Sequence, residues 1–132
     1  MVAYTNNGLA VNGYGFAPTG VITATKTYPN VSTVLPGSWV IGSWSTSTFV
    51  YGNWSISNVQ VYNTTMPQSD LAALYKRGIG GNPISLQNLV AWWPLNGNAN
   101  DYSGHNYNAN SMGTVNVIWD ANWQNGYTLP VS

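Results

Sequence analysis

The sequence predicts an all-β protein, a β-sandwich of the jelly-roll type with one short helix. Its 132 residues are enough for one domain with a hydrophobic core. Short β-branched and aromatic runs recur along the chain, separated by Asn-Gly, Pro-Asn and Pro-Gly pairs that favour tight turns. Only one segment combines helical spacing of apolar residues with start and stop signals. Many short strands with a single helix are typical of a sandwich.

The first half of the chain is expected to begin with loops and to continue as strands. Residues 4–16 contain Asn-Gly pairs, which favour positive φ, and are therefore predicted as loops. The β-branched run 21–28 is predicted as a strand that a Pro-Asn pair ends. In the strand predicted at 54–62 the apolar residues change parity, so a bulge is expected near 57–58. The further predicted strands are 39–44, 48–51 and 54–62.

The helix is predicted at about 66–77. Thr65 is its expected N-cap, because Gln68 follows three residues later in a capping-box pattern. Two cationic residues and then Gly78 are the signals of its C-terminal end. The spacing i, i+3, i+4 predicts one buried stripe, formed by Leu71, Leu74 and Tyr75.

The second half of the chain begins after a Gly-rich and Pro-containing linker at 79–88. The apolar run 89–95 is predicted as a buried strand with Pro94 at its end. Adjacent residues of a strand point to opposite faces, so one of Trp92 and Trp93 is expected inside and the other outside. An Asn-rich turn region and a last clear strand at 114–119 follow.

The composition excludes several classes of partner. Only 5% of the residues are charged, the formal net charge is +0, and no basic run exists, so nucleic-acid binding is not expected. No apolar stretch is long enough to predict membrane insertion. The chain has 0 Cys, which excludes disulfides and thiolate metal sites. A surface this poor in charge suits an extracellular or cell-surface protein, where self-association is tolerated or used.

Enzymatic activity is not expected. Glycosidases need paired carboxylates, and this chain has only three acidic residues, all Asp. No G-x-S-x-G motif, Cys nucleophile, dinucleotide fingerprint or phosphate-binding loop is present. The single His105 is interpreted as a surface or turn residue rather than a ligand.

Two stretches resemble laminin-G-like, concanavalin A-like jelly-roll domains. Residues 52–75, GNWSISNVQVYNTTMPQSDLAALY, are similar to the closing strand and short helix of that family. Residues 89–104, LVAWWPLNGNANDYSG, are similar to its opening strand and D-x-S-G turn. The resemblance implies an extracellular binding or adhesion module that sometimes binds carbohydrate or calcium. It also implies a single domain over 1–132, with a closing half at 1–78, a linker at 79–88 and an opening half at 89–132.

The order of the two stretches is the reverse of the family's order. Three accounts stay open: a circular permutant whose halves fold on each other, a cut from a tandem array, or subunits that complete one another head to tail. The last account predicts a structural, filament-forming or cell-surface adhesive subunit held by strand exchange. The alternative is a carbohydrate-binding, lectin-like module.

The candidate site residues follow from these expectations. Three sequons, at Asn30, Asn53 and Asn63, are N-glycan acceptors if the protein is exported. Aromatic rings stack on sugar faces, and Trp93 and Trp123 are the candidates for that role. No cofactor is expected apart from calcium, for which Asp101 is the candidate ligand. The alternative for Asp101 is an Asx turn, in which its carboxylate accepts nearby backbone N–H groups.

Overall fold

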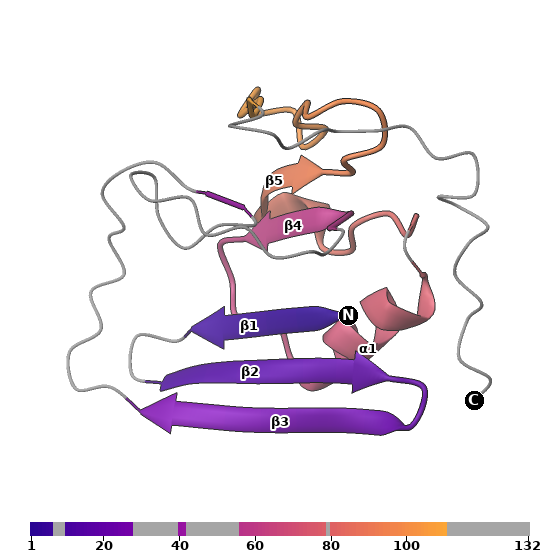
Figure 1. Ribbon diagram of the computed structural model, residues 1–132. Coiled ribbons are helices and arrows are strands. Elements are labelled where there is room, and N and C mark those ends of the chain that lie inside the picture. The colour runs from indigo at the N-terminus through magenta and orange to yellow at the C-terminus, as the bar shows by residue number, and fades with distance from the viewer. Residues whose placement is uncertain (7–9, 28–39, 42–55, 79, 111–132) are drawn as a thin grey trace.

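The computed structural model describes residues 1–6, 10–27, 40–41, 56–78 and 80–110 (Figure 1). Within them lie two antiparallel sheets, one of three strands in the order β1-β2-β3 and one of two strands, β4-β5. The strands, the helix α1 and the 3-10 turn η1 are β1 (Val2–Asn6), β2 (Ala10–Ala17), β3 (Gly20–Thr27), β4 (Val59–Tyr62), α1 (Gln68–Lys76), η1 (Leu86–Asn88) and β5 (Leu89–Trp93).

The three-stranded sheet occupies the region that was predicted as loops, and that prediction was wrong. β1 and β2 pair continuously from Val2 opposite Gly15 to Asn6 opposite Val11. Glycine has little preference for strands, but here it has a packing role. A Cβ at Gly13 would lie 3.3 Å from Cε1 of Tyr4, so the missing side chain makes room for the tyrosine ring.

The strand predicted at 21–28 is confirmed as β3, which pairs with β2 from Ala10 opposite Thr27 to Ala17 opposite Gly20. All eight residues of β3 are exposed. Among the described strands, β3 forms one edge of the sheet (Figure 1).

The helix α1 covers the inner face of the three-stranded sheet (Figure 1). Phe16 from β2 is buried against it, and its ring lies 5.6 Å from that of Tyr75. The predicted apolar stripe is confirmed, because Leu71 and Tyr75 are buried and Leu74 packs partly buried beside them.

The two ends of α1 differ in how well the sequence predicted them. The predicted N-cap is wrong, because the helix is capped by Pro67, and the Thr65 hydroxyl instead donates a hydrogen bond to the carbonyl of Asn6 at 3.2 Å. The predicted C-terminal signal is confirmed. Arg77 is the C-cap, and Gly78 follows with φ of 78°, a conformation that glycine adopts without strain.

The second sheet joins the two segments that carry the family resemblance. β4 and β5 of the same chain pair antiparallel, with Val59 opposite Trp93 and Val61 opposite Ala91. The expected irregularity exists but lies between Val61 and Tyr62 rather than near 57–58. Asn58 instead precedes the strand with a left-handed φ of 53°.

The secondary structure of the described residues is mostly strand with one short α-helix, in keeping with the predicted all-β class. Two sheets of this size do not by themselves make a jelly roll. The strands predicted at 48–51 and 114–119, and almost all of the strand predicted at 39–44, lie outside the described residues. Among the described residues, no helix has the length and apolar character needed to span a membrane.

Candidate functional site

The D-x-S-G turn is organised around the carboxylate of Asp101. Its Oδ1 accepts hydrogen bonds from the backbone N–H of Trp92 at 2.9 Å and of Ser103 at 2.8 Å. Its Oδ2 accepts from the Ser103 hydroxyl at 2.8 Å and from the N–H of Tyr107 at 3.0 Å. The contact with Ser103 N–H is the Asx turn that was the alternative for this residue. Asp101 therefore connects strand β5 to the turn that follows it.

The same contacts lower the pKa of the Asp101 carboxyl. Partial burial disfavours its charged form and by itself raises the pKa, but the bonds from Trp92, Ser103 and Tyr107 favour the carboxylate and outweigh burial. Asp101 is therefore ionised at neutral pH and stabilises the turn in that form.

Ser103 and His105 complete the turn. The Ser103 hydroxyl has three acceptors within reach, of which Asp101 Oδ2 is the nearest, and the others are the Val90 carbonyl at 3.1 Å and His105 Nδ1 at 3.0 Å. The His105 ring is exposed and stacks on Tyr107 with ring centroids 6.0 Å apart. These contacts fit the predicted turn role of His105.

Calcium fits this turn poorly. Each carboxylate oxygen of Asp101 already faces two donor hydrogens, which repel a cation. In the part of the chain that the structure describes, no group of three or more His, Cys, Asp or Glu side chains could hold a metal ion. Calcium binding at Asp101 stays a prediction.

The two neighbouring tryptophans of β5 lie on opposite faces, as their adjacency predicts. Trp93 is only 8% exposed, and its ring N–H donates a hydrogen bond to the carbonyl of Tyr107 at 2.8 Å. A buried ring offers no face to a sugar, so the stacking role predicted for Trp93 does not suit its position. Trp92 is half-buried and lines a pocket.

The indole of Trp92 is held in place by Asn58. Its Nε1–H donates to Asn58 Oδ1 at 2.8 Å, and the same amide donates from Nδ2 to the carbonyl of Gly81 at 3.1 Å. The backbone N–H of Asn58 donates to the carbonyl of Pro94 at 3.0 Å. A ring fixed by its neighbours loses little entropy when a ligand contacts it.

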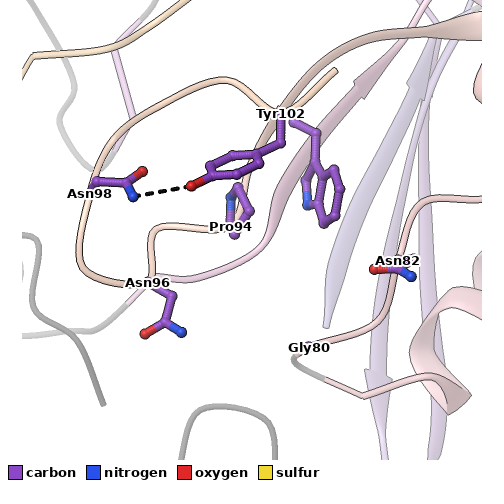
Figure 2. A pocket seen from close by; sticks show the side chains of 7 residues that line it. Gly80, Asn82, Pro94, Asn96, Asn98 and Tyr102 are labelled. Atoms are coloured by element: carbon purple, nitrogen blue, oxygen red, sulfur yellow. Dashed lines mark hydrogen bonds between the residues drawn. The ribbon is translucent and has the colours of Figure 1, made fainter. Parts of the chain in front are cut away.

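The pocket has a volume of about 230 Å³. Aromatic and amide side chains dominate its wall, and none of the described residues that line it is charged. The rings of Trp92 and Tyr102 meet edge to face, with centroids 6.1 Å apart. In Figure 2, Gly80 and Asn82 lie across the pocket from Tyr102 and Asn98. The lining residues are Gly80, Asn82, Trp92, Pro94, Asn96, Asn98 and Tyr102.

Tyr102 is positioned from both ends. Its backbone N–H donates to the carbonyl of Trp92 at 2.8 Å, and its hydroxyl accepts a hydrogen bond from Asn98 Nδ2 at 3.2 Å (Figure 2). Asn98 Oδ1 in turn accepts from the N–H of Asn100 at 3.0 Å. The Asn-rich segment therefore forms a wall that carries amide groups rather than an unstructured polar loop.

Of the three predicted glycosylation residues, the structure describes Asn63. Asn63 follows β4, is exposed, and donates its backbone N–H to the carbonyl of Asn88 at 2.9 Å. Asn30, Asn53 and the stacking candidate Trp123 lie outside the described residues. An acceptor asparagine must be accessible, and Asn63 meets that condition.

Sequence reasoning missed the residues that surround Trp92. Asn82 lies in the segment predicted as a linker, and Asn96, Asn98 and Tyr102 lie in the segment predicted as turns. The adjacency of Trp92 and Trp93 indicated that one ring faces outward, but it could not say which one.

Searches of protein families, curated proteins and solved structures found no match to this chain.

Proposed function

We propose that the protein is an extracellular carbohydrate-binding module, built on a laminin-G-like jelly roll, that binds a neutral sugar in the pocket beside Trp92. The observation that carries the proposal is the combination of two edge-to-face aromatic rings with three Asn residues around an uncharged pocket. Flat rings contact the apolar face of a sugar, while amides donate to and accept from its hydroxyls.

The size and charge of the pocket limit the class of sugar that it can bind. Pockets for drug-sized ligands are roughly 300–1,000 Å³, so a volume of about 230 Å³ suits a single sugar unit at the end or side of a glycan. Among the described lining residues there is no cationic side chain that could pair with a uronate or sulfate group. The ligand we expect is therefore an uncharged hexose or an N-acetylated amino sugar.

A tryptophan-fluorescence titration with neutral and acidic oligosaccharides tests this proposal, after a glycan array has selected the probes. Trp92 lies in the pocket wall, so a bound neutral sugar is expected to change its emission. Tyr102→Ala removes one ring of the pocket and is expected to weaken binding about fivefold or more, since ring contacts of this kind contribute on the order of 1 kcal/mol.

Tyr107→Ala is the matched control. Tyr107 lies in the same loop and is exposed to nearly the same extent, 56% against 54% for Tyr102, but it does not line the pocket. Equal loss of affinity in the two variants, or no response to any neutral sugar, would refute the proposal.

The second candidate function is a structural or adhesive subunit that assembles at the cell surface. β3 is an edge strand among the described residues and favours this function, because an edge strand offers backbone groups to another strand. The pairing of β4 with β5 within one chain favours a permuted domain over completion of this sheet by a neighbour. Electron microscopy of concentrated protein tests for filaments, and a strict monomer at every concentration would exclude them.

A further inference from the structure

Two Asn-Gly pairs lie among the described residues, and the structure places them in different surroundings. Asn12-Gly13 lies within β2, and Asn96-Gly97 lies in the loop after β5. Asparagine is chemically labile, and most of all before glycine, because glycine has no side chain to obstruct a reaction of its backbone nitrogen. Each pair is therefore a candidate for spontaneous deamidation.

Deamidation of such a pair is an internal reaction that needs only water. The glycine nitrogen bonds to Cγ of the asparagine, the Cγ–Nδ2 bond breaks, and Nδ2 leaves as ammonia with the proton that the glycine nitrogen loses. Water then adds to either carbonyl of the resulting succinimide ring and breaks one C–N bond, which leaves aspartate or isoaspartate. Because the glycine nitrogen must approach Cγ, a backbone held in another geometry is protected until it opens.

Strand pairing holds Asn12-Gly13 in place. β2 is the central strand of its sheet, and Gly13 is paired with Tyr4 on one side and with Ala24 on the other. Oδ1 of Asn12 also accepts a hydrogen bond from the Thr25 hydroxyl at 2.7 Å. Ring closure at Asn12 therefore requires the strand to open, which costs free energy.

Asn96-Gly97 lies outside every described helix and strand. It follows β5, which ends at Trp93, and Gly97 is exposed to the water that must take the proton from its nitrogen. Asn96 is half-buried and lines the pocket beside Trp92 (Figure 2). Deamidation of Asn96 would thus place a carboxylate among described lining residues that carry no charge.

We propose that Asn96 is a site of spontaneous deamidation, from which strand pairing protects Asn12, and that ageing of the folded protein gives the pocket a negative charge. Aspartate keeps the course of the backbone and replaces the donor Nδ2 with a carboxylate oxygen. Isoaspartate also adds a methylene group to the main chain and so shifts the lining of the pocket. The modification itself does not depend on sugar binding, and only its effect on a ligand rests on the proposed function.

Peptide mapping by mass spectrometry tests the proposal on the full chain, incubated at neutral pH in isotopically labelled water. The protein unfolded in guanidinium gives each site its reference rate, and the residues that precede the two pairs, Val11 and Leu95, are both apolar. In the folded protein we expect Asn12 to convert about tenfold or more slowly than in the unfolded chain, and Asn96 to stay within about threefold of its unfolded rate.

Asn96→Gln is the matched control. It keeps the amide but lengthens the side chain by one methylene group, so that a larger ring must close, which is much slower. We expect this variant to lose conversion at position 96 and to keep the slow conversion of Asn12. Protection of Asn96 as strong as that of Asn12 overturns the proposal, as does conversion of both sites at their unfolded rates in the folded protein.

Asn96→Asp reproduces the aspartate product and measures its effect on the pocket. In a tryptophan-fluorescence titration we expect it to bind a neutral sugar about fivefold more weakly than the unaltered protein, since one hydrogen bond contributes on the order of 1 kcal/mol. Equal affinity overturns the predicted effect on the pocket. An unaltered protein that binds no neutral sugar refutes the proposed function instead, and the rates at Asn96 and Asn12 still decide whether the modification occurs.

Discussion

Replacing Asp101 with Asn removes the charge at the centre of the D-x-S-G turn while nearly preserving the shape of the side chain. The carboxylate accepts four hydrogen bonds, two at each oxygen. An amide has one oxygen, so whichever way it is oriented its NH2 group must face a backbone N–H. In the better orientation the oxygen keeps the Trp92 and Ser103 N–H groups and the NH2 group confronts the N–H of Tyr107.

The expected cost follows from those contacts. A hydrogen bond to a charged group contributes about 1.5–3 kcal/mol, and Asp101→Asn loses one such bond and weakens the others. Asp101 is half-buried rather than enclosed, so solvent screening reduces the total. We expect the free energy of unfolding to fall by about 2 kcal/mol, a large part of the 5–15 kcal/mol typical of a domain.

Urea unfolding followed by tryptophan fluorescence measures this change, and Asp70→Asn is the control. Asp70 lies in the first turn of α1, and its carboxylate has one long contact, with the Ser69 hydroxyl at 3.4 Å. Its loss removes a favourable interaction with the helix dipole of about 0.3–1 kcal/mol. The reasoning is refuted if Asp101→Asn costs no more than Asp70→Asn.

Two other predictions follow from the same structure. The pKa of the Asp101 carboxyl is lowered in the folded protein, so its contribution to stability is complete above the unfolded pKa of about 3.9 and is lost as pH falls through the folded pKa. The urea midpoint, measured as the pH is lowered, should show this loss in the unaltered protein and not in Asp101→Asn. A Cβ at Gly81 would lie 2.5 Å from Cβ of Arg77 and 3.2 Å from its backbone carbon. Gly81→Ala should therefore lower the free energy of unfolding by about 1–3 kcal/mol and lower the melting temperature with it. Gly15→Ala, whose Cβ would meet Ile22 at an ordinary 3.9 Å, should leave the melting temperature nearly unchanged, and equal shifts for the two glycines would contradict this packing argument.

The structure confirms the predictions that depend on residues close together in the sequence. The i, i+3, i+4 spacing located the buried stripe of α1, and the β-branched run located β3. The alternation within β5 placed Trp92 and Trp93 on opposite faces. Each of these features follows from backbone periodicity, which a sequence displays directly.

The features that the sequence could not determine depend on contacts between distant residues. The Asn-Gly pairs before Phe16 indicated loops, but Gly13 lies in β2, which pairs with β1 and β3, and the ring of Tyr4 lies where its side chain would be. Thr65 has the pattern of an N-cap, yet its hydroxyl contacts Asn6, which lies 59 residues earlier in the chain.

The sequence alone therefore determined the period of each segment, the sparse charge and the chemistry available to a site. The tertiary structure decided which tryptophan faces the pocket, because Asn58 fixes one indole while the carbonyl of Tyr107 accepts the N–H of the other. It also decided that Asn82, Asn96, Asn98 and Tyr102 line one pocket. Periodicity describes one segment at a time, whereas a pocket exists only where separate segments pack together.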